Sequence, residues 1–206
     1  ITYSEIRLQL GVLEKELWLY RALNGRTIVF SKDIAEKSTT LTYGYDVALG
    51  IASIIGKETA FGEAFHITSD ESYTWKEILE IYLDTIEKKT GMRPKVLLLD
   101  KSPHLEWIGA KWQVILDRYY NRRFDNSKIQ QYIDTSQFVR TESGLISCLE
   151  SFLCHPQFKK MGWGIQGTYD RITGEWAPFS EISIIKDCIS YLLHRTVVPP
   201  KSKLSI

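Results

Sequence analysis

A group of arginines in the second half of the chain carries the clearest chemical potential. Arg118, Arg122 and Arg123 stand just before the sequence Asp125-Asn-Ser-Lys128. A guanidinium group can donate to two phosphate oxygens at once, and the two tyrosines within the group offer faces on which a base or sugar can stack. The pattern therefore indicates a site for a phosphorylated ligand. The alternative is a solvated basic helix end, where arginines complement the helix dipole.

The other side chains capable of chemistry show no pattern of a catalytic or metal site. The histidines are His66, His104, His155 and His194, and they have neither H-x-x-x-H spacing nor a cysteine partner at metal-ligand spacing. We therefore expect no metal ion. No G-x-S-x-G nucleophile elbow occurs. The three cysteines also lack metal-ligand spacing, so we expect reduced thiols.

The stretch from Phe61 to Asp100 contains the strongest structural signals. Thr74-Trp-Lys-Glu77 is a capping box, and apolar residues follow it at helical spacing until Gly91, which suits the left-handed position after a helix. We expect the end of a buried strand at Ala64–Ile67, a polar loop, this capped helix, and a second strand at Lys95–Leu99. Such an order places a polar loop between a strand and a helix start.

The remaining elements are predicted from periodicity and turn residues. Before the central stretch we expect a helix from Leu10 to Tyr20 that ends at Asn24-Gly25, a strand at Arg26–Phe30, a loop at Ser31–Thr40, and a helix at Val47–Ile55 capped by Asp46. After it we expect a helix start at Ser102-Pro103, a short helix at Ser127–Ile133, a helix from Thr141 to His155, an aromatic loop at Gly162–Trp176, and a last helix from Ser180 or Glu181 with one apolar side.

Three short segments carry a resemblance to a known family. Gly62-Glu-Ala-Phe-His-Ile-Thr-Ser69, followed by Ser72-Tyr-Thr-Trp-Lys-Glu-Ile78, is similar to a strand, loop and helix start of the extended short-chain dehydrogenases/reductases. This is the NAD-dependent epimerase/dehydratase family, which acts largely on nucleotide sugars. Gly44-Tyr-Asp-Val-Ala48 and Asp125-Asn-Ser-Lys-Ile129 resemble two further boxes of that family. The resemblance covers roughly residues 10 to 155 in order, but only two short boxes within it are distinctive, Gly62–Ile78 and Asp125–Ile129.

The chain also departs from the family pattern at several positions. His66 stands where the family usually has asparagine, and Thr68 where it usually has glycine. Many members carry an arginine seven residues before the position of Asp46, where it grips the nucleotide phosphates, and this chain has Thr39 there. These departures put an intact pyrophosphate clamp of the usual kind in doubt.

The resemblance implies an α/β fold, namely the C-terminal part of a Rossmann-type NAD-dependent epimerase/dehydratase with a mainly helical substrate lobe. It implies a nucleotide sugar as the ligand, and the substrate-binding residues that it suggests are Arg118, Arg122, Arg123, Phe30, Ile28 and His66. For Ile28 and Phe30 a plain core strand is the alternative, and for His66 a structural histidine. No catalytic residue is predicted in this chain.

The cofactor of the family, NAD or NADP, is held mainly by a glycine-rich turn that joins a strand to a helix. We expect no such turn among these residues, and we place it upstream of Ile1. The family also uses a Tyr-x-x-x-Lys pair for proton transfer, and no tyrosine here is followed four residues later by a lysine. We therefore expect the catalytic half to precede Ile1, and homodimerisation to occur through that half.

Composition bounds the remaining classes of function. The chain has 206 residues and a formal net charge of +1, which argues against a nucleic-acid-binding face. No run of about 18 apolar residues indicates a membrane span, and we expect a cytoplasmic location. We divide the chain into residues 1–155, the substrate-binding portion, and residues 156–206, an aromatic loop and helix packed on it. The rival hypothesis is a non-enzymatic binding or regulatory protein that uses a degenerate form of the fold.

Overall fold

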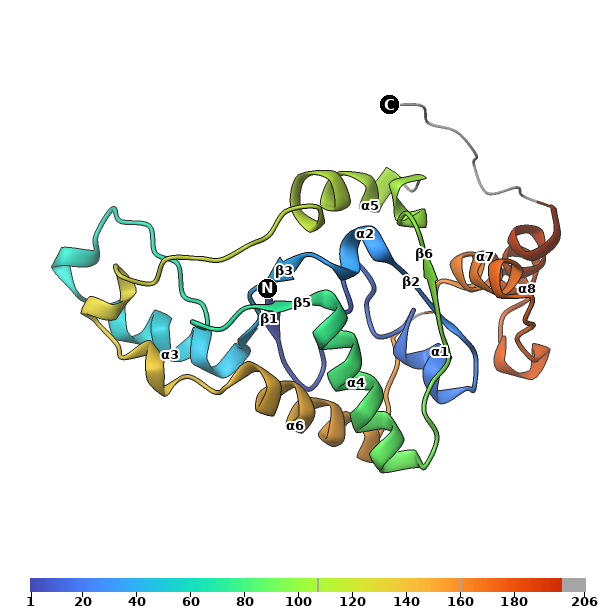
Figure 1. Ribbon diagram of the computed structural model, residues 1–206, viewed down its shortest axis with the longest axis horizontal. Coiled ribbons are helices and arrows are strands. Elements are labelled where there is room, and N and C mark those ends of the chain that lie inside the picture. Colours follow the sequence, from blue (N-terminus) through green and yellow to red (C-terminus); the bar gives the residue numbers. More distant parts are fainter. Residues whose placement is uncertain (107, 160, 198–206) are drawn as a thin grey trace.

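The computed structural model describes residues 1–106, 108–159 and 161–197, and it has an α/β architecture (Figure 1). Helix α4 (Trp75–Thr90) and helix α6 (Thr141–Cys154) pack against each other beside short strands, while α7 (Trp163–Thr173) and α8 (Ile185–Leu192) form a separate helical layer at one end. Most of the buried apolar side chains belong to one cluster, which includes residues of α4, α6 and α7. Hence a single core joins most elements.

Helix α4 forms as the capping box predicts. The Thr74 hydroxyl accepts from the Glu77 amide at 3.2 Å, and the Glu77 carboxylate accepts from the Thr74 amide at 2.6 Å. The helix ends at Gly91, whose φ of +76° favours glycine. Its inner face buries Trp75 and Tyr82, and the Tyr82 ring stacks on Trp18 at 4.6 Å between ring centroids. The predicted boundaries of this helix are confirmed.

The two predicted hydrophobic strands pair with each other. Strand β2 (Ile28–Ser31) and strand β6 (Val96–Leu99) run parallel, with Ile28 opposite Val96. All residues of β2 are buried. Parallel strands that are far apart in sequence need a long crossover connection, and here that connection contains helix α4. The pair therefore holds the first and middle thirds of the chain together.

The helix predicted from Leu10 to Tyr20 is wrong over most of its length, because the chain turns instead. Leu10 and Leu13 pair with each other across a tight turn in which Gly11 has a φ of +61°. A Cβ at Gly11 would lie 2.9 Å from the Phe30 ring, so this turn needs glycine for contact as well as for backbone angle. Helix α1 is therefore short (Leu19–Leu23), although it ends before Gly25 as expected.

Two further segments differ from the sequence predictions. Residues 64–67 lie in no strand, and the segment predicted as a loop, 31–40, contains helix α2 (Lys32–Ala35) and strand β3 (Ser38–Thr39). Strand β3 pairs antiparallel with β5 (Tyr73–Thr74). The polar side chains of these strands hid them from a hydrophobic pattern search.

Several other elements match in kind but differ at their ends. The remaining strands are β1 (Thr2–Tyr3) and β4 (Thr42–Tyr43), which are parallel. Helix α3 spans Gly44–Ile54, and its N-cap is Tyr43 rather than Asp46. The Asp46 carboxylate lies in the first turn and accepts from the Val139 amide at 2.9 Å.

Helix α5 is short (Ile108–Gln113) and continues as a π-helical turn. In the segment predicted as a short helix, only a 3-10 turn (Ile129–Gln131) forms.

The aromatic loop predicted at Gly162–Trp176 is wrong, because helix α7 begins at Trp163. Its glycines stand at G-x-G-x-x-G spacing, as Gly162, Gly164 and Gly167. Residues 155–159 and 161–162, just before α7, form no strand. The glycines pack on another helix instead, and a Cβ at Gly167 would clash with the Tyr191 carbonyl oxygen of α8. This spacing therefore serves a close helix–helix contact.

A buried network of charges attaches α7 to the rest of the molecule. Arg21 of α1 donates to Asp170 of α7 at 2.6 Å, and neither side chain has any exposed area. Arg26 also reaches Asp170, at 3.3 Å, and Tyr191 of α8 donates to the same carboxylate at 2.7 Å.

The predicted boundary at residue 156 remains a prediction. Tyr169 belongs to the main core, whereas a second cluster is formed by Trp163, Ala177, Ile182 and Tyr191. Residues 198–206 of the second segment lie outside the described residues.

We predict that Asp170→Asn destabilises the protein strongly. The change removes the fully buried charge partner of Arg21, which keeps only the partly exposed Glu175, and breaking a buried pair from one side typically costs about 3–5 kcal/mol. Urea unfolding followed by circular dichroism measures the loss. The matched control is Asp84→Asn, because Asp84 pairs with Arg93 on the surface, where its side chain is 69% exposed. Equal midpoints for the two variants would show that the buried network does not hold the helices.

We also predict acid sensitivity that originates at His104. Burial lowers the pKa of His104 to about 3, so the folded state keeps this ring neutral while the unfolded chain titrates near 6.5. The unfolded state then binds more protons between these values, and the stability from the neutral ring is complete above pH 6.5 and declines as the pH falls. His104→Gln should flatten the dependence of unfolding free energy on pH by up to about 1.4 kcal/mol per unit. The exposed His155→Gln should leave the slope unchanged.

Candidate functional site

The two distinctive sequence boxes, Gly62–Ile78 and Asp125–Ile129, contact each other in the fold. Asn126 links them, because its amide nitrogen donates to the Thr68 carbonyl oxygen at 2.6 Å and to Asp70 at 2.8 Å. Its amide oxygen accepts from the Thr68 amide at 3.2 Å and the Thr68 hydroxyl at 3.0 Å. The Asn126 side chain is 4% exposed. A single asparagine thus satisfies the polar groups of a loop that has no strand partner.

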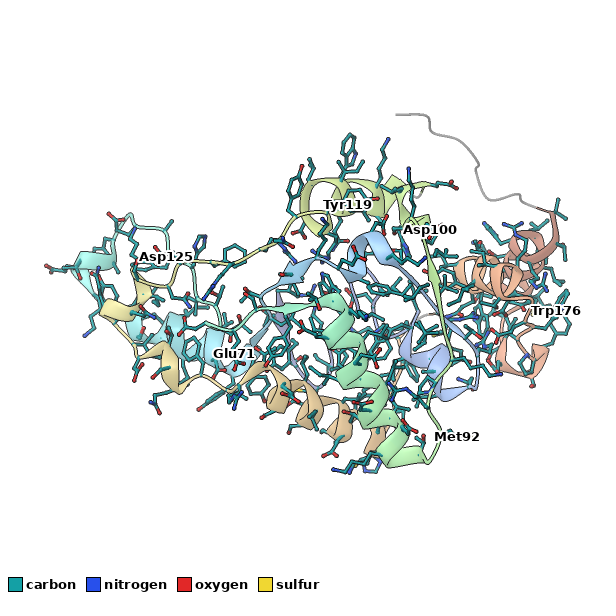
Figure 2. All side chains as sticks on the ribbon, in the orientation of Figure 1. Glu71, Met92, Asp100, Tyr119, Asp125 and Trp176 are labelled. Carbon is teal, nitrogen blue, oxygen red and sulfur yellow. The ribbon has the colours of Figure 1, made fainter. Side chains whose placement is uncertain are left out.

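Further polar contacts extend this link on both sides. Lys128 forms an ion pair with Glu63, and its ammonium group lies 5.1 Å from the centre of the Phe65 ring. The hydroxyl of Thr135 donates to the second oxygen of Asp70 at 2.9 Å. Figure 2 shows that Asp125 lies at the end of the molecule away from Trp176. The contacts between the two boxes therefore lie toward that end.

The loop is also tied to the start of helix α6. The Ser69 amide donates to the Thr42 hydroxyl at 2.9 Å, and the Thr141 hydroxyl donates to the Leu41 carbonyl oxygen at 3.2 Å. Glu71, labelled in Figure 2, accepts from the Thr141 amide at 2.7 Å. The carboxylate therefore satisfies a backbone donor in the first turn of α6. Sequence reasoning missed these roles because each joins residues far apart along the chain.

Arg122 is the predicted ligand residue whose placement is most informative. Its guanidinium group donates to the Thr39 hydroxyl at 2.7 Å and contacts Asp117 at 2.5 Å, and its side chain is 18% exposed. The Arg122 amide also donates to the Ser38 carbonyl oxygen at 3.0 Å. Burial lowers the pKa of Arg122. Its buried Nε has no hydrogen-bond partner among the described residues.

Arg118 lies deeper than a ligand-binding arginine usually does. Its Nε donates to the Gly11 carbonyl oxygen at 3.0 Å, it pairs with Asp117, and its guanidinium carbon lies 5.6 Å from the centre of the Trp75 ring. Only 2% of the residue is exposed. Burial, and then the charge of Arg122, lower its pKa to about 10. Arg118 therefore stabilises the turn at Gly11, and its predicted contact with a ligand stays a prediction.

The other predicted ligand residues occupy contrasting environments. Arg123 is exposed, and His66 is also exposed with its ring 5.0 Å from that of Phe124. Ile28 and Phe30 lie in the core, with exposed fractions of 0% and 3%. The structure thus brings Arg122 and Arg118 together through Asp117. Ligand contact by Arg123, His66, Ile28 and Phe30 stays a prediction.

An open pocket of about 530 Å³ lies beside strand β5, but its lining is unlike a phosphate site. Carboxylates dominate it, and its residues are Tyr73, Thr74, Lys76, Glu77, Glu80, Ile81, Asp84 and Glu142. A phosphorylated ligand is repelled by such a lining. No group of three or more His, Cys, Asp or Glu side chains able to hold a metal ion occurs in residues 1–106, 108–159 and 161–197.

Comparison with solved structures identifies the fold. UDP-glucuronic acid 4-epimerase from Bacillus cereus, in complex with UDP-glucuronic acid and NAD, is similar with a TM-score of 0.51 over 74% of this chain, at 18% identity. The chain has part of the fold of a Rossmann-type, NAD-dependent epimerase. An epimerase from Methanothermobacter thermautotrophicus is similar with a TM-score of 0.50 over 65% of this chain, at 19% identity. The α/β epimerase fold predicted from the two boxes is thereby confirmed.

The likeness to these epimerases is partial and lies in the fold alone. This chain spans 43% of the Bacillus cereus epimerase and 35% of the archaeal one. No family model matches the sequence, and no curated protein sequence matches it. Within the described residues no helix is both long and apolar enough to cross a membrane. An epimerase fold at such low identity is recognised only from the backbone and from a few boxes.

We predict that Asn126→Ala loosens the loop of this epimerase-like fold without unfolding the chain. The Thr68 amide loses its acceptor, and removing one such hydrogen bond should raise hydrogen exchange at residues 68–70 by roughly tenfold. Exchange followed by mass spectrometry measures the change. Asn121→Ala is the matched control, because Asn121 accepts from the Ser38 amide at an exposed site. Unchanged exchange at residues 68–70 in Asn126→Ala would contradict the proposed role of Asn126.

Proposed function

We propose that this chain is the C-terminal, substrate-binding portion of an NAD(P)-dependent epimerase, dehydratase or reductase that acts on a nucleotide sugar. The fold supports this proposal, since UDP-glucuronic acid is bound by one of the similar epimerases. The convergence of the two family-like boxes on Asn126 supports it further. The reaction itself belongs to a catalytic half that is not among these residues.

The observation that carries the proposal is the position of Arg122 beside Thr39. Family members that grip the nucleotide phosphates from the position of Thr39 use an arginine there. In this chain a guanidinium group reaches the same place from another segment, because Arg122 donates to the Thr39 hydroxyl at 2.7 Å. We assign to Arg122 the contact with the nucleotide diphosphate. Exposed Arg123, the next residue, adds a second cation at the same surface.

The local electrostatics favour an anionic ligand at Arg122. Its ion-pair partner, Asp117, is also paired with Arg118, so one carboxylate neutralises two guanidinium groups. The surplus positive charge is partly buried, and burial lowers the pKa of both arginines. A phosphate group at the exposed part of the Arg122 guanidinium would supply the missing negative charge.

The described residues do not fit the NAD cofactor. Dinucleotide binding needs a glycine-rich turn between a strand and a helix, where backbone groups approach the pyrophosphate. The glycines at this spacing, Gly162 to Gly167, do not fit that role. Residues 155–159 and 161–162 before them form no strand, and Gly167 packs against helix α8. We therefore derive no step through the cofactor. What this chain contributes is the binding and orientation of the nucleotide sugar.

We predict that residues 1–206 bind UDP and that Arg122→Ala weakens this binding by roughly tenfold or more, because a charge-assisted contact to phosphate is lost. Isothermal titration calorimetry measures both affinities. The matched control is Arg93→Ala, whose guanidinium pairs with Glu80 and Asp84 at the far end of α4. An unchanged affinity in Arg122→Ala would overturn the assignment of Arg122 while leaving the substrate class intact.

The rival function is a non-enzymatic binding or regulatory protein with a degenerate epimerase fold. The departures from the usual family residues at Thr39, Tyr45 and Thr68 favour it. The same titration separates the two proposals. If the unaltered chain binds no nucleoside diphosphate, the rival gains support, and the proposed function fails independently of the role of Arg122.

A further inference from the structure

A second pocket lies between helix α5 on one side and helix α7 on the other. Its volume is about 420 Å³, within the range of small-molecule sites. Helices α5 and α7, which lie near one another in Figure 1, form its walls together with the N-terminal segment. The described lining residues are Val12, Leu17, His104, Gly109, Ala110, Ile165, Thr168 and His194. None of them belongs to the surface around Arg122.

The walls of this pocket are mainly apolar and small on one side. Gly109 and Ala110 of α5 contribute little side-chain volume, and a Cβ at Gly109 would meet no atom within 4 Å. Val12, Leu17 and Ile165 supply the aliphatic part. No lysine or arginine is among the described lining residues, so an anionic ligand would lack a fixed cation. The lining therefore favours an uncharged ligand with an apolar body.

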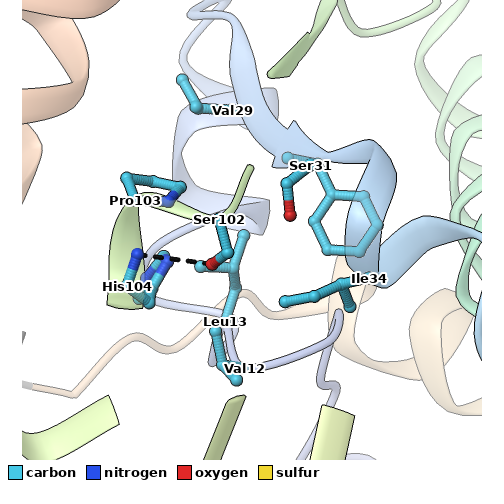
Figure 3. Close-up of a pocket in the computed structure, with 9 residues that line it drawn as sticks. Val12, Leu13, Val29, Ser31, Ile34, Ser102, Pro103 and His104 are labelled. Carbon is cyan, nitrogen blue, oxygen red and sulfur yellow. Dashed lines mark hydrogen bonds between the residues drawn. The ribbon is translucent and has the colours of Figure 1, made fainter. Parts of the chain in front are cut away.

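His104 forms the inner wall of the pocket. Its Nε2 lies 3.0 Å from the Tyr169 hydroxyl, and the residue is 4% exposed. The same imidazole borders a much smaller cavity on its other side, of about 10 Å³, which Figure 3 shows between His104, Ile34 and Ser31. That smaller space has room for about one water molecule. His104 therefore serves as a packed partition rather than as the polar group offered to a ligand.

His194 supplies a hydrogen-bond acceptor at the pocket. Its Nδ1 lies 2.8 Å from the Ser190 carbonyl oxygen, and a carbonyl can only accept. Nδ1 must therefore carry a proton, and in the neutral ring the other nitrogen, Nε2, is an acceptor. No hydrogen bond to Nε2 is present among the described residues. Thr168, which also lines the pocket, already donates its hydroxyl hydrogen to the Gly164 carbonyl oxygen. The acceptor at His194 therefore favours a ligand with a hydrogen-bond donor.

We propose that this pocket binds a small, uncharged aromatic molecule with a single hydrogen-bond donor, of the size of indole, and that the donor is directed to Nε2 of His194. The pocket volume, the absence of lysine and arginine from the described lining, and the acceptor at His194 each support this chemistry. Such a site is separate from nucleotide-sugar binding. It would couple the ligand to the relative position of α5 and α7, since both helices line it.

Isothermal titration calorimetry of the full chain with indole tests the proposal. Indole should bind the unaltered protein, and 1-methylindole, which lacks the donor, should bind about tenfold more weakly. Ala110→Leu fills the pocket and should abolish indole binding. Ala52→Leu, on the exposed side of α3, is the matched control and should leave binding unchanged. Circular dichroism confirms that each variant is folded.

The role of His194 is tested by His194→Phe, which keeps an aromatic ring of similar size and removes the acceptor. Indole affinity should fall about tenfold in this variant, to the level of 1-methylindole, whose own affinity should not change. Equal binding of indole by Ala110→Leu and by the unaltered protein would overturn the site. Equal binding of indole and 1-methylindole by the unaltered protein would overturn the assigned donor contact.

Discussion

The ion pair between Arg21 and Asp170 is the interaction on which the arrangement of the helical layers depends. Both side chains are fully buried, and Arg21 comes from the segment before β2 while Asp170 comes from α7. Arg21 also donates to the Thr27 carbonyl oxygen at 2.7 Å, at the entrance to β2. One guanidinium group therefore fixes the start of the parallel strand pair and the position of α7 together. A buried charge has few alternative partners, so this contact specifies one arrangement.

Glu175 shows how the network around this ion pair is balanced. Burial is the largest single influence and by itself would raise the pKa of Glu175, yet hydrogen bonds from Thr27 and Thr173 and the charge of Arg21 lower it overall. The carboxylate is thus kept ionised beside the two arginines. Because Glu175 also accepts from the Thr27 amide, the end of α7 is fastened to the same strand entrance. Pocket walls that include α7 inherit their position from this network.

The sequence predicted elements whose signals are local. The capping box at Thr74, the aliphatic strands, and helix α6 were found because a few neighbouring residues define each of them. Helix α7 was missed because its apolar face is interrupted by glycines, which in the fold allow close contact with α8. The apolar side predicted for α8 exists, but Ile185 and Ile189 on it are exposed, at 80% and 54%. Periodicity identifies an apolar face and does not say what covers it.

The candidate site was predictable only in part, for the same physical reason. The arginine group and the Asp125-Asn-Ser-Lys128 box could be recognised as short patterns, whereas the role of Asn126 depends on Thr68 and Asp70, which are far away in sequence. Long-range polar contacts leave no periodic trace, because a single side chain satisfies them. A resemblance to a family can indicate some of these contacts indirectly, because it matches several separate segments of the chain at once.

The environment of Thr39 shows that a positive charge can lie at a position whose own residue is uncharged. This position has a threonine, and its hydroxyl accepts a hydrogen bond from the guanidinium group of Arg122. Since β3 pairs with β5 at this position and the Arg122 amide bonds to Ser38, the backbone of residues 121–122 is held alongside the strand. Arg122 therefore places its positive charge next to Thr39, although the two residues belong to different segments of the chain. Electrostatic function at a cleft is therefore better judged from the positions of charges in space than from a motif read along the chain.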